Sequence, residues 1–296
     1  MMHKYRGEAA LLLTVIIWGY GFVAVGQSLV YLTPFQMLFA RFVIGVLATL
    51  VFFRKRIGLI DQDTLIKGAK LGTIQFIGFS FQTIGFIYTT PANNAFLTSV
   101  YVILVPLIAL LLYKRKPDRF ELTGAIIAMA GIFVLTYNSG APVKLGDMLT
   151  LVCAVAYAFQ IFYTTIYMKG KNPIDITIVM IATCMVLSGI ATLVEGKPME
   201  VPPPDGISAI LFLALASTFF STILQNYGQK YTTETRAAIF FSTEALWGTI
   251  FSVMFLGELI TMKLVIGGIL IFIAILAAEL KISFSKQTAV EIKPNS

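Results

Sequence analysis

Charged residues are scarce in this sequence, which also carries only two cysteines and one histidine. Of its 296 residues, 12% are charged and 57% are hydrophobic, whereas about a quarter of the residues of a soluble domain are charged. The mean hydropathy is +0.85. These values exclude an ordinary soluble domain and predict an all-α integral membrane protein.

The few residues with reactive side chains lack the spacing of known catalytic or metal sites. Cys153 and Cys184 lie within apolar stretches and are interpreted as packing residues, and His3 lies in the N-terminal segment. There is no phosphate-binding Gly-Lys-Ser/Thr loop and no metal-spaced cluster of histidines and cysteines. We therefore expect no metal, no cofactor and no enzymatic activity.

Apolar runs of about twenty residues are separated by charged or Pro/Gly-rich breaks, and each run is long enough to cross a bilayer. The sequence therefore predicts ten transmembrane helices, at residues 8–30, 34–53, 64–88, 92–113, 119–138, 145–168, 173–195, 206–228, 234–256 and 261–282. A cleaved signal within residues 1–26 is the competing interpretation of the first run. It would remove the counterpart of the sixth helix, so we favour ten spans.

The net charge of +7 comes from basic residues that cluster between these runs. If the N-terminus is cytoplasmic, the outer side keeps only Lys144, Lys197 and Lys263. This asymmetry indicates membrane topology and not nucleic-acid binding. We expect a multi-pass protein of the cell (cytoplasmic) membrane with both termini in the cytoplasm, and residues 283–296 as a cytoplasmic tail.

The chain contains an internal repeat. The stretch Gln82–Thr90 (QTIGFIYTT) recurs as Gln225–Thr233 (QNYGQKYTT), and the same offset pairs further residues downstream without a gap. The first and sixth predicted helices also match when Trp18 is set against Tyr157. Residues 1–140 and 141–282 thus form two five-helix repeats. Because five is odd, the second copy enters the membrane from the opposite side, and the repeats are inverted.

Polar and aromatic side chains recur on single faces of several predicted helices. Because the bilayer core holds no water, such side chains face protein or a cavity. Taken singly, each is explained by interhelical hydrogen bonds worth on the order of 1 kcal/mol or by aromatic packing. Their clustering at matched depth predicts one substrate site with nine residues: Trp18, Gln82, Asn94, Tyr101, Tyr157, Gln160, Gln225, Glu244 and Trp247.

Glu244 is the sharpest candidate, because an ionisable side chain inside a span costs several kcal/mol unless it is paired, hydrated or protonated. Two interpretations stay open. Glu244 contacts a substrate ammonium group or carries a coupling proton, or it forms a structural ion pair with Arg41. Glu258, at the end of the same predicted helix, is interpreted as structural.

A set of short motifs, in order and spacing, resembles the drug/metabolite transporter superfamily and in particular its EamA-like ten-helix transporters: Trp18-Gly19, Pro34, Glu244, Gly257-Glu258 and Gly267-Gly268. The resemblance covers nearly the whole chain. It implies two inverted repeats around a central cavity, and passage of small metabolites, commonly amino acids and often outward. The sequence departs from the family pattern at Lys114-Arg115, at Ala245 and at Tyr157.

These observations predict a secondary active transporter that exports a small amphipathic metabolite, an amino acid or a related amine or zwitterion, by alternating access. Its partners would be the lipid bilayer, a small-molecule substrate, and a coupling proton or an exchanged solute, with no nucleic acid. Two alternatives stay open: a non-transporting membrane partner or regulatory subunit, and a drug or nucleotide-sugar exchanger of the same fold. A membrane-embedded enzyme ranks last.

Overall fold

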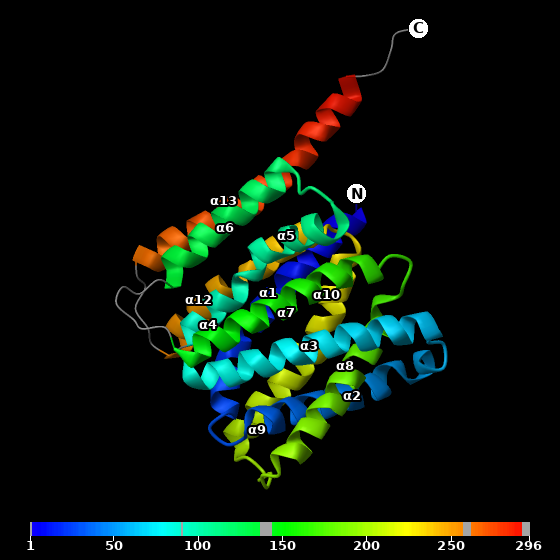
Figure 1. Cartoon of the computed structure of the whole chain (residues 1–296), viewed down its shortest axis with the longest axis vertical. Helices are drawn as coiled ribbons and strands as arrows, with labels where there is room; N and C mark the ends of the chain where they lie inside the picture. Colours follow the sequence, from blue (N-terminus) through cyan, green and yellow to red (C-terminus); the bar gives the residue numbers. More distant parts are fainter. Residues whose placement is uncertain (1, 90, 137–143, 257–261, 292–296) are drawn as a thin grey trace.

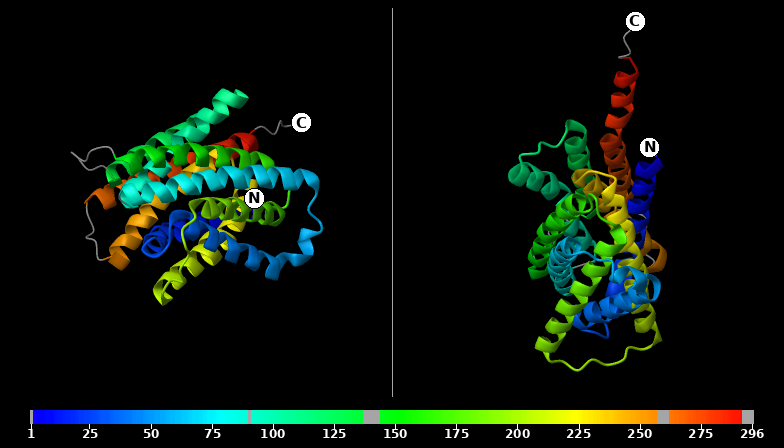
Figure 2. Two further views of the ribbon diagram at one scale, coloured as in Figure 1. Left: turned by 60° about the horizontal axis from the view of Figure 1, so that its bottom comes forward. Right: turned by 90° about the vertical axis from the view of Figure 1, so that its right-hand side faces the viewer.

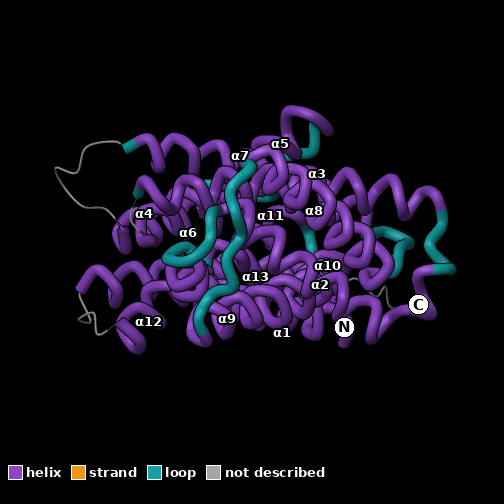
Figure 3. Tube along the Cα trace, turned by 90° about the horizontal axis from the view of Figure 1, so that it is seen from below, coloured by secondary structure: helices purple, strands orange, loops and turns teal. Residues whose placement is uncertain are grey.

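The computed structural model describes the backbone of residues 2–89, 91–136, 144–256 and 262–291, and within these ranges every regular element is a helix (Figure 3). The first half of the chain forms α1 (Met2–Ser28), α2 (Pro34–Ile57), α3 (Gln62–Tyr88), α4 (Pro91–Ser99), α5 (Tyr101–Tyr113) and α6 (Arg119–Thr136). The second half forms α7 (Leu145–Tyr167), α8 (Pro173–Glu195), α9 (Pro204–Leu211), the π-helix η1 (Phe212–Phe220), α10 (Ser221–Lys230), α11 (Glu234–Ser242), α12 (Glu244–Leu256) and α13 (Met262–Glu291).

Seven stretches of the described residues are helical, long and apolar enough to cross a membrane: Tyr5–Ser28, Pro34–Ile57, Asn94–Tyr113, Leu145–Tyr167, Pro173–Glu195, Pro204–Lys230 and Glu234–Phe255. The other three predicted spans fall on α3, α6 and α13. All three are helices, and α13 contains the shorter apolar stretch Val265–Ala277. The chain is therefore an all-helical, multi-pass membrane protein.

Two of the predicted helices are interrupted. The expected helix at 92–113 is divided into α4 and α5 by a turn at Val100, and the expected helix at 234–256 is divided into α11 and α12 by a turn at Thr243. Neither break has a proline or glycine at the turn, which is why sequence patterns did not signal it. The expected helix at 206–228 continues without a break but passes through the π-helical segment η1.

The C-terminal helix is longer than predicted. We expected the last span to end at residue 282, but α13 continues to Glu291 and extends past the other helices (Figure 2). Residues 292–296 of the predicted tail lie outside the described residues. Along its first part α13 packs lengthwise against α6 (Figure 1).

The helices α2 and α8 begin with the same local chemistry. A capping side chain precedes a proline in both: Thr33 before Pro34 and Asn172 before Pro173. The Thr33 hydroxyl accepts from the backbone N–H of Gln36 at 3.3 Å, and the Asn172 side chain accepts from the backbone N–H of Ile174 at 2.9 Å. Each cap satisfies a free N–H group at a helix start, where proline loses no hydrogen bond.

Glycines allow two pairs of helices to approach closely. A Cβ atom placed on Gly85 of α3 would lie 2.6 Å from Thr150 Oγ1 and 3.0 Å from the carbonyl oxygen of Gly146 in α7. A Cβ atom on Gly228 of α10 would lie 2.8 Å from the carbonyl oxygen of Gly7 in α1. Small residues at such crossings bring the helix backbones together.

The two ends of the bundle carry different interactions. One end, here called the basic end, contains the turns at 58–61, 168–172 and 231–233. Among the described residues, ion pairs link neighbouring elements there: Arg56 with Asp175 at 2.7 Å, Lys171 with Asp61 at 2.8 Å, Arg115 with Glu234 at 2.7 Å, and Arg236 with Glu121 at 3.8 Å. At the other end, here called the opposite end, hydrogen bonds join Tyr31 to Asp205 at 2.8 Å and Thr33 to Glu195 at 2.6 Å.

Candidate functional site

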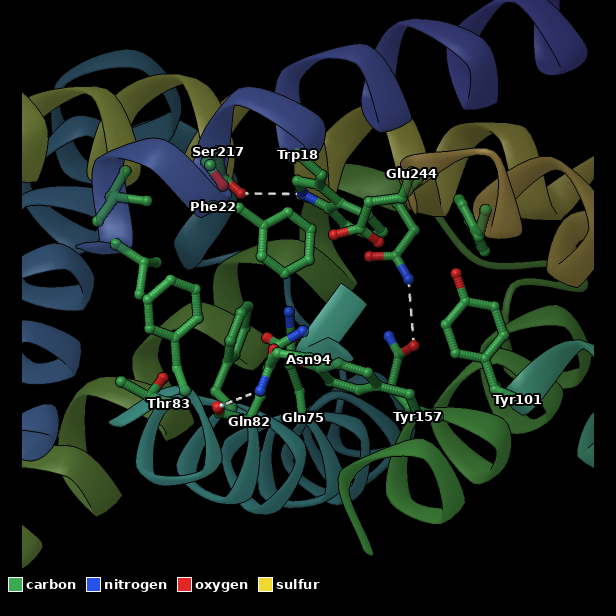
Figure 4. Close-up of a pocket in the computed structure, with 18 of the residues that line it drawn as sticks. Trp18, Phe22, Gln75, Gln82, Thr83, Asn94, Tyr101, Tyr157, Ser217 and Glu244 are labelled. Atoms are coloured by element: carbon green, nitrogen blue, oxygen red, sulfur yellow. Dashed lines mark hydrogen bonds between the residues drawn. The ribbon is translucent and has the colours of Figure 1, made fainter. Parts of the chain in front are cut away.

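A cavity lies inside the bundle between helices of both halves. It measures about 760 Å³ including its open mouth and is bordered by side chains of α1, α2, α3, α4, α5, α7, η1, α10, α11 and α12 (Figure 4). Eight of the nine predicted substrate residues line it: Trp18, Gln82, Asn94, Tyr101, Tyr157, Gln160, Gln225 and Glu244. Arg41 borders the same space.

Trp247 is the predicted residue that the structure does not place on this lining. Its side chain packs against the glycine face of α1, because a Cβ atom on Gly19 would lie 2.5 Å from Trp247 Cβ. The Trp247 ring also lies 6.4 Å from the ring of Phe251. Trp247 therefore supports the close contact between α1 and α12 behind the cavity.

Tyr101 and Glu244 border the cavity at equivalent positions of the two broken helices. Tyr101 is the first residue of α5, directly after the turn at Val100, and Glu244 is the first residue of α12, directly after the turn at Thr243. A helix break inside a membrane protein brings helix termini and their free backbone groups next to a binding site. The cavity thus receives a tyrosine from one break and a carboxyl group from the other.

Arg41 is held by neutral groups. Its Nε donates to Thr218 Oγ1 at 2.8 Å, and a terminal nitrogen lies 3.4 Å from Ser217 Oγ. Its guanidinium carbon lies 4.6 Å from the centre of the Phe79 ring, a distance at which a cation is attracted to the ring face. Both side chains are described, and no ion pair joins Arg41 to Glu244. The predicted alternative of a structural pair between them is therefore not formed here.

A network of neutral hydrogen bonds fixes one wall of the cavity. The Tyr157 hydroxyl donates to Gln82 Oε1 at 3.1 Å, and Gln82 Nε2 donates to Thr98 Oγ1 at 3.3 Å. Asn94 Nδ2 donates to the Gln82 carbonyl at 3.1 Å and to Thr150 Oγ1 at 2.9 Å. These bonds tie α3, α4 and α7 together and hold the polar side chains in place around the cavity.

Several polar atoms at the cavity have no partner within the described residues. The atoms are Asn94 Oδ1, Tyr101 Oη, Gln160 Nε2 and Gln225 Oε1. Buried polar groups in proteins are nearly always hydrogen-bonded, and a membrane interior offers no bulk water as a substitute. The residues that carry these atoms line the cavity, so small side-chain movements would offer their free donors and acceptors to a polar solute.

Four phenylalanines line the cavity and are absent from the site that the sequence predicts. Phe22, Phe79, Phe86 and Phe241 all border it. The available signal lay in α3, where Phe79 and Phe86 share a helix face with the predicted residue Gln82. Polar stripes do not reveal them, because phenylalanine in an apolar span is equally typical of a surface that faces lipid.

The cavity extends toward one end of the bundle. Its residues on α1 run from Trp18 to Val25, and those on α3 run from Gln75 to Phe86, which are the C-terminal halves of both helices. These halves lead to the opposite end. The N-terminal half of α1 contributes Leu11 and Val15, both fully buried, to the apolar core instead. We therefore infer that the apolar core of α1 closes the cavity on the side of the basic end in this conformation.

Among the described residues, no group of three or more His, Cys, Asp or Glu side chains is placed to hold a metal ion. Glu258, which was interpreted as structural, lies outside the described residues. Cys153 and Cys184 are both buried and unpaired with each other. The chemistry available at the cavity is therefore that of hydrogen bonding, ring contacts and two separate charged groups.

The chain is similar to known proteins in sequence and in fold. The EamA-like transporter family matches residues 5–137 and again residues 144–278. An "uncharacterized transporter" of Archaeoglobus fulgidus is 32% identical over 279 residues, which cover 94% of this chain and 87% of the relative. The "uncharacterized transporter YyaM" of Bacillus subtilis is 24% identical and covers 75% of each chain. A solved crystal structure shares the fold, with a TM-score of 0.78 at 16% identity over 94% of this chain and 97% of the other.

Proposed function

Because this chain belongs to the EamA-like transporter family, we propose that it is a secondary active transporter that exports a small amphipathic amine or zwitterion, such as an amino acid. It works by alternating access between two inverted five-helix repeats. The membrane is the cytoplasmic membrane, and the basic end with both termini faces the cytoplasm. The observation that carries the substrate proposal is the carboxyl group of Glu244 at a cavity bordered by aromatic rings.

The two family matches support the repeat, since each covers one half of the chain. The helix breaks support it as well, because the offset from Val100 to Thr243 equals the offset from Gln82 to Gln225, which relates the two similar sequence stretches. Between α1 and α7, the offset that sets Trp18 against Tyr157 also sets Gly7 against Gly146.

The close helix crossings follow the same two offsets. Gly85 meets Gly146 where α3 crosses α7, and Gly228 meets Gly7 where α10 crosses α1. Each residue of one crossing is the counterpart of a residue in the other. One crossing lies near each end of the bundle, as an inverted arrangement requires. Ten spans result when α4 and α5 are counted as one helix, α9 through α10 as one, and α11 and α12 as one.

The charge distribution supports the orientation. The turns of the basic end carry Lys114, Lys116, Lys169 and Lys171, which favour the cytoplasmic side of a membrane. The cavity, which extends to the other end, then opens outward. Outward export would require the second state, in which the basic end opens and the cavity is reached from the cytoplasm.

The lining supports an amphipathic substrate with a cationic group. Phe22, Phe79 and Phe241 present apolar ring surface, and Glu244 has no ion-pair partner among the described side chains. An ammonium group would supply the partner that Glu244 lacks and would also be attracted to the ring faces. The same carboxyl group is our proposed carrier of a coupling proton once the substrate has left.

Arg41 favours a second candidate, an exchanger of anionic solutes. Its guanidinium borders the cavity and its described contacts are with hydroxyl groups and rings, so it keeps hydrogen-bonding capacity for a carboxylate or phosphate. A zwitterion satisfies both Arg41 and Glu244, whereas a nucleotide sugar satisfies Arg41 alone. Three related probes separate these cases: phenylalanine, phenethylamine and 3-phenylpropionate.

The test is a thermal-unfolding series with purified protein, followed by flux measurements in proteoliposomes. A ligand that binds the folded state raises the unfolding temperature. We expect phenylalanine and phenethylamine to raise it and 3-phenylpropionate to have no effect. Glu244→Gln should remove these shifts and saturable flux, while Glu200→Gln, at an exposed site in the turn 196–203, should retain both.

A result in which only 3-phenylpropionate binds, with Glu244→Gln unchanged, would favour the anion exchanger. A folded protein that shows no saturable flux with any of the three probes or with a nucleotide sugar would favour a non-transporting membrane subunit. Proton coupling is tested in the same vesicles, because flux of the wild type should respond to an imposed pH gradient and flux of a proton-independent exchanger should not.

A further inference from the structure

A second set of polar side chains is buried along α7 and α10, next to the cavity and on the side of the basic end. Gln160 and Thr164 belong to α7, and Gln225, Asn226 and Gln229 belong to α10. Each is at most 3% exposed. Gln160 and Gln225 border the cavity, and Gln229 lies one residue before the end of α10. The set therefore runs from the cavity to the basic end.

Each of these five side chains keeps one polar atom without a hydrogen-bond partner among the residues that the structure describes. The atoms are Gln160 Nε2, Thr164 Oγ1, Gln225 Oε1, Asn226 Oδ1 and Gln229 Oε1. A buried group of this kind destabilises the conformation that buries it, and the effect is larger where no water is at hand. The α7 members, Gln225 and Gln229 form a seam between α7 and α10, whereas Asn226 faces α8 through its bonds to Thr177 and Met180. Together these groups point to a second conformation in which this region is hydrated.

The two α7 members are the repeat counterparts of cavity residues on α1. The offset that sets Trp18 against Tyr157 relates Gly21 to Gln160 and Val25 to Thr164. Gly21 and Val25 both line the open part of the cavity. The polar positions of α7 thus match the part of α1 that faces the path toward the opposite end.

The three α10 members are the counterparts of cavity residues on α3. The offset between the two similar sequence stretches was found from sequence alone, and the α3 residues that it selects all line the cavity. The pairs are Gln82 with Gln225, Thr83 with Asn226, and Phe86 with Gln229.

We propose that the seam between α7 and α10 is the inner half of the solute path, closed here and opened toward the basic end in the second state. The inference rests on the proposed function, because inverted repeats alternate by exchanging conformations between their halves. In the present state the wall formed by α1 and α3 is open. After the exchange α7 and α10 adopt that conformation, and the five polar atoms become hydrated.

The neighbouring seam between α3 and α8 is built differently. A Cβ atom on Gly68 would lie 2.6 Å from Val179 Cβ, and Leu71, Ile176 and Met180 are fully buried there in an apolar cluster. None of these side chains carries a polar group that needs a hydrogen-bond partner. This seam gains nothing from contact with water, so it serves as the internal control.

The experiment measures thiol accessibility in vesicles of known orientation. The background variant carries Cys153→Ala and Cys184→Ala, and single cysteines are introduced by Thr164→Cys, Gln229→Cys and, as the control, Leu71→Cys. A membrane-impermeant thiosulfonate is added from the basic-end side. We expect Thr164→Cys and Gln229→Cys to react roughly tenfold faster than Leu71→Cys, since only exposed thiols react readily.

The companion measurement concerns Val25→Cys, the counterpart of Thr164→Cys, with reagent added from the opposite side. In the double variant, a bulky adduct at Thr164→Cys should hold the inner seam open and slow the reaction of Val25→Cys. Each variant is first checked for folding by its size-exclusion profile and unfolding temperature. If one of the two seam variants misfolds, the other still tests the inference.

Two results overturn the inference: Leu71→Cys reacting as fast as both seam positions, or both seam positions staying unreactive from the basic-end side while flux is intact. The second result would leave the proposed function standing and place the path elsewhere. Reactive seam positions in a protein without saturable flux would support the wet seam and reject the transport function. Gln229→Leu, which removes the unpartnered oxygen, should favour the closed seam and lower flux without loss of folding.

Discussion

The two ends of the bundle are held together by different kinds of interaction. At the basic end, Arg56, Lys171 and Arg115 each reach a carboxylate on another element. At the opposite end, the described contacts are mainly hydrogen bonds such as that between Thr33 and Glu195, and the cavity extends in this direction. The difference suggests that closure at the basic end depends on a few charged contacts, which single substitutions and salt should weaken.

Both ends of the bundle have a close helix crossing at a glycine. Replacing these glycines should produce the largest loss of stability. Gly228→Ala and Gly85→Ala each add a Cβ atom within 3.0 Å of backbone or side-chain atoms of the crossing helix. Overpacking of this kind costs about 1–3 kcal/mol. We expect both variants to unfold several degrees below the wild type in detergent, as measured by differential scanning fluorimetry.

Gly58→Ala is the control for both crossings, because its added Cβ atom would have no neighbour within 4 Å and its φ of −71° suits any residue. If Gly228→Ala destabilises the protein and Gly85→Ala does not, the two crossings are not equivalent. That outcome would count against the repeat on which the proposed mechanism depends.

The next effect concerns closure of the basic end. Arg115→Gln removes the partner of Glu234, whose side chain is only 2% exposed. An unpaired buried carboxylate costs about 1–3 kcal/mol, so we expect the equilibrium to shift toward the state with an open basic end. Thiol modification of Thr164→Cys from that side should become about five- to tenfold faster. A destabilisation of the closed state by about 1.4 kcal/mol raises the ratio of open to closed protein tenfold.

Lys197→Gln is the matched control at the opposite end, because it removes a lysine that is 63% exposed from a pair with Glu195. It should leave the labelling rate unchanged, since exposed pairs contribute little. Equal acceleration by both variants would mean that closure does not depend on the charged contacts of the basic end.

Much of this arrangement could be predicted from the sequence because it rests on simple physical signals. The apolar runs predicted where helices lie. The assignment of counterparts from the offset between Gln82 and Gln225 stays a prediction. Glu244 and Tyr101 were predicted to lie at equivalent depths, and both border the cavity. Polar residues inside apolar spans stand out in a sequence, so the polar lining could be found without coordinates.

Other features could not be predicted, because they depend on tertiary packing. The helices break at Val100 and Thr243, which carry no intrinsic signal for a turn. Phe22 and Phe241 line the cavity, but a phenylalanine that faces lipid looks the same in a sequence. The sequence offers Glu244 as a possible ion-pair partner of Arg41. The partners of Arg41 are instead two hydroxyl groups on η1, which cannot be predicted from charge alone.

A smaller effect is expected where the two proposed repeats differ in one hydrogen bond. Tyr157 donates its hydroxyl to Gln82 Oε1, whereas its counterpart Trp18 donates its indole N–H to the backbone carbonyl of Ser217 at 3.1 Å (Figure 4). Tyr157→Phe should cost about 0.5–1.5 kcal/mol and lower the unfolding temperature slightly. Trp18→Phe should cost more, because it also removes part of a ring that packs 5.5 Å from Phe241. If Tyr157→Phe lowers the unfolding temperature more than Trp18→Phe does, these hydrogen bonds and ring contacts do not account for the stability contributed by the two side chains.

The smallest effect is expected at the surface of the basic end. The Lys171 ammonium and the Thr64 side chain and N–H lower the pKa of Asp61 below its ordinary value, and Asp61 and Asp63 raise the pKa of Lys171. The contribution of Asp61 to stability is therefore present above its unfolded pKa of about 3.9 and lost as pH falls below it. The contribution of Lys171 is lost only above its unfolded pKa of about 10.4.

Asp61→Asn tests this ion pair separately from the helix cap. Asp61 Oδ1 accepts from the backbone N–H of Thr64 at 2.6 Å, and asparagine is also a good capping residue at the start of α3. The difference in unfolding temperature between wild type and variant should be small and constant from about pH 5 to pH 9 and should shrink below about pH 4. High salt should reduce it as well, since both groups are near solvent. A difference that persists at low pH would mean that Asp61 acts through the helix cap and not through its charge.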